Sequence, residues 1–181
     1  VDRFGTWGCQ SRLTPHLDEW CSRAIVFDRV YTPVPLTLPS HVSLMTGLYP
    51  PEHGIHLNNG VKRLGDSVPV LAEILQQRGY RTGAFIASFV LDGKYGLDRG
   101  FDLYDDEIDV AGEASPLDPH NHRMKPGSQV VSSALHWLQS LRKNHAFLCW
   151  VHLFDAHAPY HPREELFGKR FSESPYDAGI S

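Results

Sequence analysis

Two short, largely apolar segments, residues 80–89 and 146–154, constrain the fold more than any other feature of this sequence. Each has the length of a β-strand, and continuous apolar character is typical of strands whose two faces are both covered. Amphipathic helices are predicted over residues 68–78 and 128–143. This alternation of strands and helices predicts an α/β fold with a central, mostly parallel sheet sandwiched by helices.

The remaining segments give weaker signals. Thr14 and Pro15 predict the start of a helix, and the alternating residues 24–31 predict a further strand. Ser40 is a candidate cap for a short helix through Thr46. The helix predicted over 128–143 has an apolar stripe that we expect to face the core, formed by Val131, Ala134, Leu135, Leu138 and Leu141. Residues 48–66 and 91–127 are predicted to be loops.

Composition excludes several classes of protein. The chain has 181 residues, of which 41% are hydrophobic and 21% charged, as in an ordinary globular domain. Its net charge of −4 argues against binding to a nucleic-acid duplex, which normally requires a basic surface. No apolar run approaches the roughly 20 residues that a membrane-spanning helix needs. No export signal is visible, so the sequence assigns no compartment.

The segment from Pro33 to His41 is the stretch in which we expect chemistry. Its prolines brace a loop that brings Thr37 close to a helix start, where unpaired N–H groups attract anions. A threonine hydroxyl there can attack a phosphorus or sulfur centre once a metal or a base activates it. His41 lies about one helical turn further on. Spacing alone favours a structural interpretation, a proline-rich loop before a capped helix.

The segment 37–50 resembles the signature of the sulfatases in the alkaline phosphatase superfamily. Segments 14–18, 79–83, 100–102 and 151–160 resemble other family segments and follow in family order. The resemblance implies that residues 1–181 are the N-terminal portion of a sulfatase-type catalytic domain that continues beyond both ends. It also implies a metal-dependent hydrolase acting on an anionic sulfate or phosphate ester.

Three departures from the family pattern bear on the chemistry. Thr37 stands at the position of the formylglycine precursor and cannot be converted, so no formylglycine is expected. His41 replaces the motif arginine, and Ala87-Ser88-Phe89 replaces a Lys-x-His substrate clamp. A threonine nucleophile resembles instead the nucleotide pyrophosphatase/phosphodiesterase branch. The resemblance therefore implies a divalent metal, Ca or Mg if sulfatase-like and Zn or Mn if phosphodiesterase-like, with Thr37 as a shared ligand and the other ligands outside this chain.

The resemblance also implies a role for each candidate residue. Thr37 would be the nucleophile, and His157 would donate a proton or hydrogen bond on the leaving-group side. Asp155 would orient His157 or approach the metal. Apart from the resemblance, Asn58 and Asn59 lie in the loop after the helix, where they either serve a turn or line the entrance, with Asn59 as the substrate-binding candidate.

Other histidines have open or structural interpretations. His41 either hydrogen-bonds the threonine or a substrate oxygen, or donates to a carbonyl and holds the loop. His53 and His152 are predicted to be structural.

Two alternative functions stay open. One is a phosphodiesterase or phosphotransferase of the same superfamily, and the other is a catalytically inactive scaffold or binding domain.

Overall fold

The computed structural model describes residues 3–10, 13–59, 62–108, 124–158, 160 and 168–180. The chain divides into two compact units, of which one comprises residues 1–31 and 155–181 and the other residues 32–154. Each unit is described by itself. No helix in the described ranges is both long and apolar enough to cross a bilayer.

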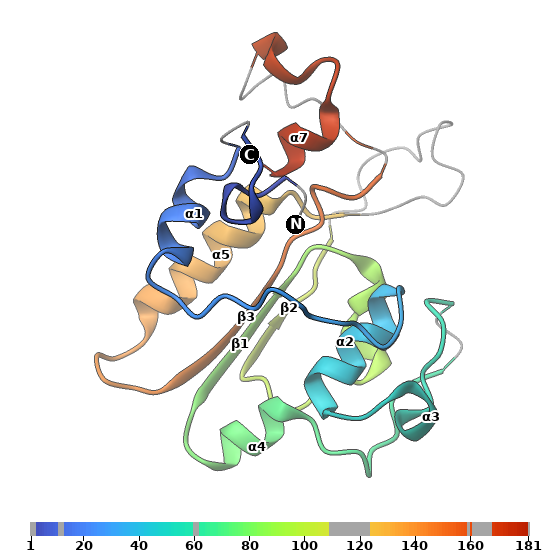
Figure 1. Ribbon diagram of the computed structural model, residues 1–181. Helices are drawn as coiled ribbons and strands as arrows, with labels where there is room; N and C mark the ends of the chain where they lie inside the picture. Colours follow the sequence, from blue (N-terminus) through green and yellow to red (C-terminus); the bar gives the residue numbers. More distant parts are fainter. Residues whose placement is uncertain are drawn as a thin grey trace. The chain divides into compact units, whose positions relative to one another are not determined.

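A parallel sheet forms the centre of the larger unit (Figure 1). Its described strands are β1 (Arg81–Ile86), β2 (Leu103–Asp105) and β3 (Phe147–His152), in the order β2-β1-β3. Both neighbours run parallel to β1, and the register of β1 with β3 extends from Arg81↔Phe147 to Ile86↔His152. The predicted parallel α/β arrangement is therefore confirmed.

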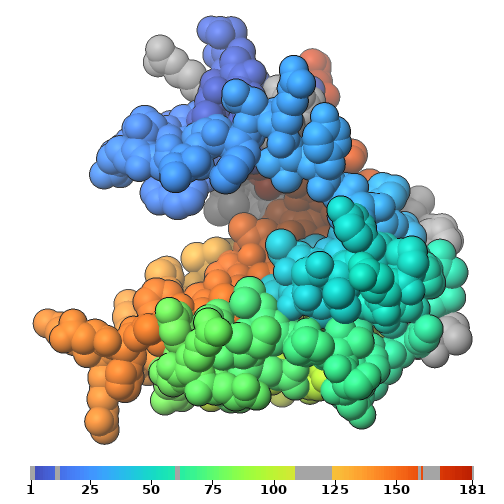
Figure 2. Space-filling model, turned by 60° about the horizontal axis from the view of Figure 1, so that its bottom comes forward, coloured from blue at the N-terminus to red at the C-terminus, as the bar shows by residue number. Residues whose placement is uncertain are grey.

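Helices cover both faces of this sheet, as predicted (Figure 1), and in Figure 2 the segments that contain residues 37–46 (cyan) and 71–77 (green) lie side by side on the surface. On one face, α5 (Gly127–Ser140) packs against β1 and β3. On the other face, α2 (Thr37–Thr46) and α4 (Leu71–Gln77) contact each other. Each face has its own apolar core, with Val130, Ala134 and Trp137 in the first and Leu38, Val42 and Met45 in the second.

The buried face of α5 differs from the predicted one. Val130 and Trp137 are buried, whereas Val131 and Leu135 are 39% and 52% exposed. The large Trp137 ring fixes this rotation because it lies over Gly83 of β1, where an added Cβ would come within 2.9 Å of the ring. The fit of one indole over one glycine thus outweighed the apolar stripe that the sequence favours.

Two further predictions need correction. The helix predicted to begin at Ser40 begins at Thr37, because Pro39 falls in the first turn, where its missing N–H has no intrahelical partner to lose. The predicted loops contain short elements, namely α3 (Pro50–His53), the 3₁₀ turn η3 (Gly93–Tyr95) and β2, and the 3₁₀ turn η2 (Phe89–Leu91) begins at the last residue of the segment predicted as a strand. Residues 109–123 of the second loop lie outside the described ranges.

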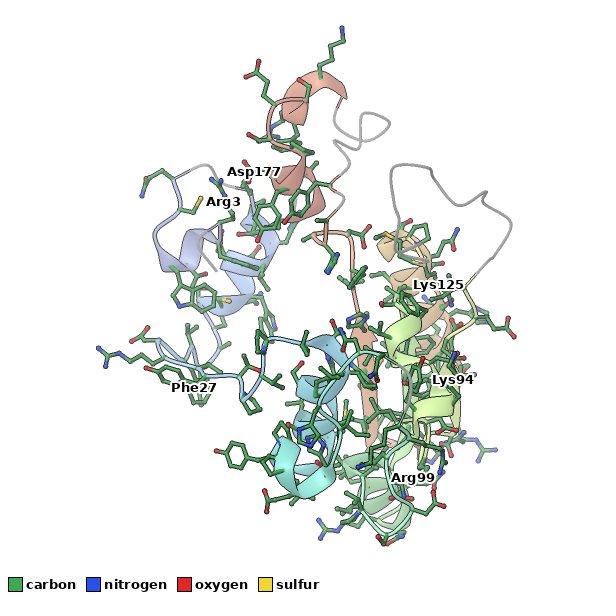
Figure 3. The ribbon with its side chains drawn as sticks, turned by 90° about the vertical axis from the view of Figure 1, so that its right-hand side faces the viewer. Arg3, Phe27, Lys94, Arg99, Lys125 and Asp177 are labelled. Atoms are coloured by element: carbon green, nitrogen blue, oxygen red, sulfur yellow. The ribbon has the colours of Figure 1, made fainter. Side chains whose placement is uncertain are left out.

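The smaller unit contains α1 (Pro15–Cys21), α7 (Pro175–Ile180) and the 3₁₀ turns η1 (Gly5–Trp7) and η4 (Gly168–Phe171). Leu13, Phe171 and Ala178 form its core, and Arg3 pairs with Asp177 at 3.2 Å (Figure 3).

The strand predicted over residues 24–31 is wrong. This segment is irregular, and Phe27 is 69% exposed (Figure 3). A strand needs a hydrogen-bonded neighbour, and among the described residues none pairs with this segment.

Candidate active site

Thr37 is the first residue of α2. Leu36 before it is extended, with φ −126° and ψ 139°, so the chain turns into the helix at the threonine itself. Leu38 and Val42 anchor the helix, since their side chains are almost completely buried in the core below it. Thr37 is partly exposed. The structure thus places this hydroxyl-bearing residue at a helix N-terminus, as the sequence predicts.

Asn58 fixes the first turn of α2. The backbone N–H of Leu38 donates to Asn58 Oδ1 at 2.8 Å, and the N–H of Ser40 donates to the Leu36 carbonyl at 3.1 Å. Pro39 has no N–H to offer. Asn59, the residue predicted from the sequence to bind substrate, is exposed. The residue that contacts the helix is its neighbour Asn58, which only the preference of Asn for helix caps points to.

His41 holds the carbonyl of Thr37. Its Nδ1 lies 2.7 Å from that oxygen, and a carbonyl only accepts, so Nδ1 carries the hydrogen. Burial lowers the pKa of His41, although the hydrogen bond to Thr37 opposes this change. Two roles for His41 were open from the sequence. The observed hydrogen bond corresponds to the role in which the imidazole donates to a carbonyl and holds the loop.

Two rings from β3 contact His41. The Trp150 ring stacks on it with centroids 5.6 Å apart and an interplanar angle of 26°. The His152 ring meets it edge to face, at 5.1 Å and 82°. Burial, with a further contribution from His41, lowers the pKa of His152 to about 4. Both imidazoles are therefore neutral at neutral pH.

The other buried histidine supports the structural role predicted for it. His53 Nε2 lies 2.9 Å from Ser43 Oγ, and its Nδ1 accepts from the Ile55 N–H at 3.1 Å. Both nitrogens are engaged, which links the end of α3 to the middle of α2.

The Lys-x-His substrate clamp of the family pattern has no counterpart at the position where it is expected. Ala87 and Ser88 are buried directly after β1, and neither carries a charge. The nearby Lys94 pairs with Asp92 at 2.7 Å.

His157 and Asp155 belong to the smaller unit, whereas Thr37, His41 and Asn59 belong to the larger one. His157 is exposed, and its Nδ1 lies 2.6 Å from the Ala158 carbonyl oxygen. Because each unit is described separately, the association of His157 and Asp155 with Thr37 stays a prediction.

A metal centre requires several converging ligands. In the described ranges no group of three or more His, Cys, Asp or Glu side chains is arranged to hold a metal ion. These residues therefore do not by themselves fit the divalent metal that the resemblance implies.

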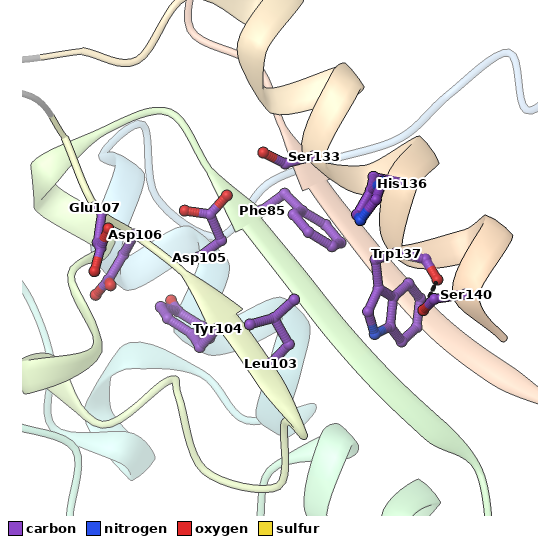
Figure 4. Close-up of a pocket in the computed structure, with 10 residues that line it drawn as sticks. All are labelled: Phe85, Leu103, Tyr104, Asp105, Asp106, Glu107, Ser133, His136, Trp137 and Ser140. Atoms are coloured by element: carbon purple, nitrogen blue, oxygen red, sulfur yellow. Dashed lines mark hydrogen bonds between the residues drawn. The ribbon is translucent and has the colours of Figure 1, made fainter.

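A cavity of about 560 Å³ lies between β2 and α5 (Figure 4). Phe85, Leu103 and Trp137 contribute apolar surface, and Asp106 and Glu107 add carboxylates. Because Phe85 and Trp137 belong to the core under α5, the cavity lies on the opposite face of the sheet from α2. It contains none of the predicted catalytic residues.

Comparisons with known proteins agree with this fold. A family model described as Sulfatase matches residues 2–178. N-acetylgalactosamine-6-sulfatase of Rattus norvegicus is 26% identical over 141 residues, which cover 70% of this chain and 26% of the relative.

Two solved structures are similar at lower identity, which shows a common fold. One is a protein in complex with its substrate D-glucosamine-2-N,6-O-disulfate, with a TM-score of 0.70, 21% identity, and coverage of 96% of this chain and 35% of that one. The other is the phosphonate monoester hydrolase of Agrobacterium radiobacter, with a TM-score of 0.62, 18% identity, and coverage of 89% and 39%.

Proposed function

Because this chain belongs to the sulfatase family, we propose that its protein hydrolyses sulfate or phosphate esters with Thr37 as the nucleophile. The observation that carries the proposal is the position of Thr37 as the first residue of α2, in a turn held by Asn58 and His41. The chain spans about a quarter of the matched rat relative, so the activity proposed is that of the full-length protein.

In the proposed reaction, Thr37 Oγ forms a bond to the sulfur or phosphorus while the bond from that atom to the leaving oxygen breaks. The threonine proton passes to a proton acceptor. His157, oriented by Asp155, gives a proton to the leaving oxygen as general acid. Water then attacks the same sulfur or phosphorus and returns a proton to Thr37 Oγ as the bond to it breaks, which releases sulfate, phosphate or, from a phosphodiester, a phosphate monoester. Asn59 would contact the substrate at the entrance.

A phosphoester, including a phosphodiester, is the favoured substrate within this proposal. Ala87 and Ser88 place no cation where the resemblance expects the sulfate clamp. A divalent metal, Ca or Mg in one case and Zn or Mn in the other, is the proposed cofactor. Since the described residues supply no cluster of ligands, no step of the reaction is assigned to it.

The deciding experiment compares turnover of an aryl sulfate and an aryl phosphodiester by the full-length protein. Thr37→Ala is expected to abolish turnover, because no other hydroxyl begins the helix. Thr46→Ala, at the opposite end of α2, is the matched control and is expected to keep activity. Full activity of Thr37→Ala would overturn the mechanism, and preference for the sulfate would overturn the preferred substrate.

An inactive scaffold is the second candidate. His41 in place of arginine and the buried, uncharged clamp position favour it. Absence of turnover of both substrates by the folded, metal-supplemented full-length protein would support this alternative.

A further inference from the structure

We propose that Trp150 and His152 are positioning residues, which hold the His41 imidazole as a proton acceptor rather than as a cation that binds the anionic ester. The inference rests on the proposed role of Thr37 and deepens it. It names His41 Nε2 as a group that accepts a hydrogen bond from a hydroxyl or a water.

The hydrogen bond to Thr37 determines which nitrogen of His41 carries hydrogen. Nδ1 donates to the Thr37 carbonyl at 2.7 Å, so in the neutral ring Nε2 has the lone pair. A neutral ring with this tautomer accepts a hydrogen bond at Nε2 and offers an anionic oxygen no donor there. His41 therefore cannot do at this nitrogen what the arginine of the family motif does.

The sheet supplies the two contacts that fix this ring. Trp150 and His152 are two residues apart on β3, so their side chains point to the same face, towards α2. The Trp150 ring stacks on His41, and the His152 ring stands nearly perpendicular to it. Together with the hydrogen bond, these contacts hold the imidazole from three directions.

His152 differs from a histidine that serves only the core. His53, also buried, uses both of its ring nitrogens in hydrogen bonds. His152 is 9% exposed, and its buried Nδ1 has no hydrogen-bond partner in the described part of the chain. A buried polar atom without a hydrogen bond destabilises the folded protein, and a phenylalanine would fill the same space without such an atom. The contribution of His152 beyond filling the core is therefore its ring contact with His41.

Neutrality of His41 follows from the same arrangement. A charged ring here would lie half-buried beside a second imidazole, and in the described ranges no carboxylate hydrogen-bonds to either ring.

The test is a histidine-selective ¹H–¹⁵N correlation spectrum at pH 7.5, which reports the tautomer of each ring without requiring turnover. For the wild type we expect His41 with hydrogen on Nδ1 alone. His152→Ala is expected to shift the Nδ1 resonance towards that of an unprotonated nitrogen, because the ring becomes free to turn. His152→Phe, which restores a ring edge, is expected to restore the wild-type signal.

His136→Ala removes an exposed histidine from α5, on the other face of the sheet, and is the control that should change nothing at His41. If His152→Ala does not fold, His152→Leu replaces it, since leucine fills more of the space without a ring edge. A charged or Nε2-protonated His41 in the wild type would overturn the proposal. So would an unchanged His41 signal in the folded His152→Ala or His152→Leu protein.

Because this readout needs no substrate, it separates the two proposals. An inactive full-length protein with the expected tautomer would refute the hydrolysis and leave the positioning role intact.

Discussion

At the scale of single residues, burial and hydrogen-bond partners distinguish the histidines of this chain from one another. The chain has 11 histidines, and the sequence alone does not show which of them have a functional role. The structure separates His53, which uses both nitrogens, from His41, which anchors a carbonyl, and from His152, whose pKa is far below its ordinary value. These differences come from burial and neighbours, which no local pattern encodes.

The first prediction concerns the pH dependence of stability. His152 has a pKa of about 4 in the folded protein against 6.5 when unfolded, so between these values the unfolded chain binds more protons. The free energy of unfolding should therefore be constant above pH 7 and should decrease as the pH falls. From pH 7.5 to 5 this residue alone should cost about 2 kcal/mol.

Urea unfolding at both pH values measures this difference. The His152→Leu protein should lose less stability over the same range, because one lowered pKa is gone while His41 and His53 still contribute in the same direction. Equal losses in the two proteins would contradict the prediction.

At the scale of elements, helix faces are decided by packing across the sheet. Val130 of α5 is completely buried and its neighbour Val131 is 39% exposed, although the sequence pattern favours Val131 as the core residue. One position along a helix turns a side chain by about 100°, so the two valines form a natural comparison.

Val130→Ala should lower the free energy of unfolding by about 2 kcal/mol, since it removes buried methyl groups from a close-packed core. Val131→Ala, the same substitution one residue later, should change it by less than about 0.5 kcal/mol. Denaturant midpoints of the two variants provide the measurement. The reverse order would show that α5 buries the face the sequence favours.

A second prediction at this scale concerns the start of α2. Asn58→Ala removes the acceptor for the Leu38 N–H and should cost about 1 kcal/mol, as the loss of a helix cap does. Asn58→Asp, which keeps an acceptor oxygen at this position, is the matched control, with a smaller expected effect. Equal costs in thermal or urea unfolding would refute the capping role.

Most of the larger unit could be predicted from the sequence because its elements carry local signals. The apolar strands, the amphipathic helices and the proline-braced loop at Thr37 are all local. The irregular segment 24–31 could not be predicted, because a strand depends on a neighbour and not on alternation alone. The roles of Asn58, Trp150 and His152 also depend on contacts between residues distant in the sequence. For Trp150 and His152, the i, i+2 spacing indicates only that both side chains lie on one face of β3.

At the scale of the whole molecule, the chain spans 35% and 39% of the two similar structures, so it corresponds to a part of each of them. Its described residues include the nucleophile candidate and no metal-binding cluster. Thr37 and His157 belong to different units of the chain.

The prediction at this scale concerns metal binding. The 181-residue chain should bind Ca²⁺, Mg²⁺, Mn²⁺ and Zn²⁺ only weakly, because a hard divalent ion needs several carboxylate or imidazole ligands. Isothermal titration calorimetry of the chain beside the full-length protein tests this. Micromolar or tighter binding at unit stoichiometry by the chain would refute it.

The fit of Trp137 over Gly83 has a consequence for how this family can diversify. An added Cβ at position 83 collides with the indole, while a smaller residue at 137 leaves a hole that the glycine cannot fill. Each substitution is harmful alone, and the pair relieves both defects. A path that enlarges residue 83 and reduces residue 137 in separate steps therefore passes through a destabilised single variant in either order, so changes at these two sites are expected to occur together.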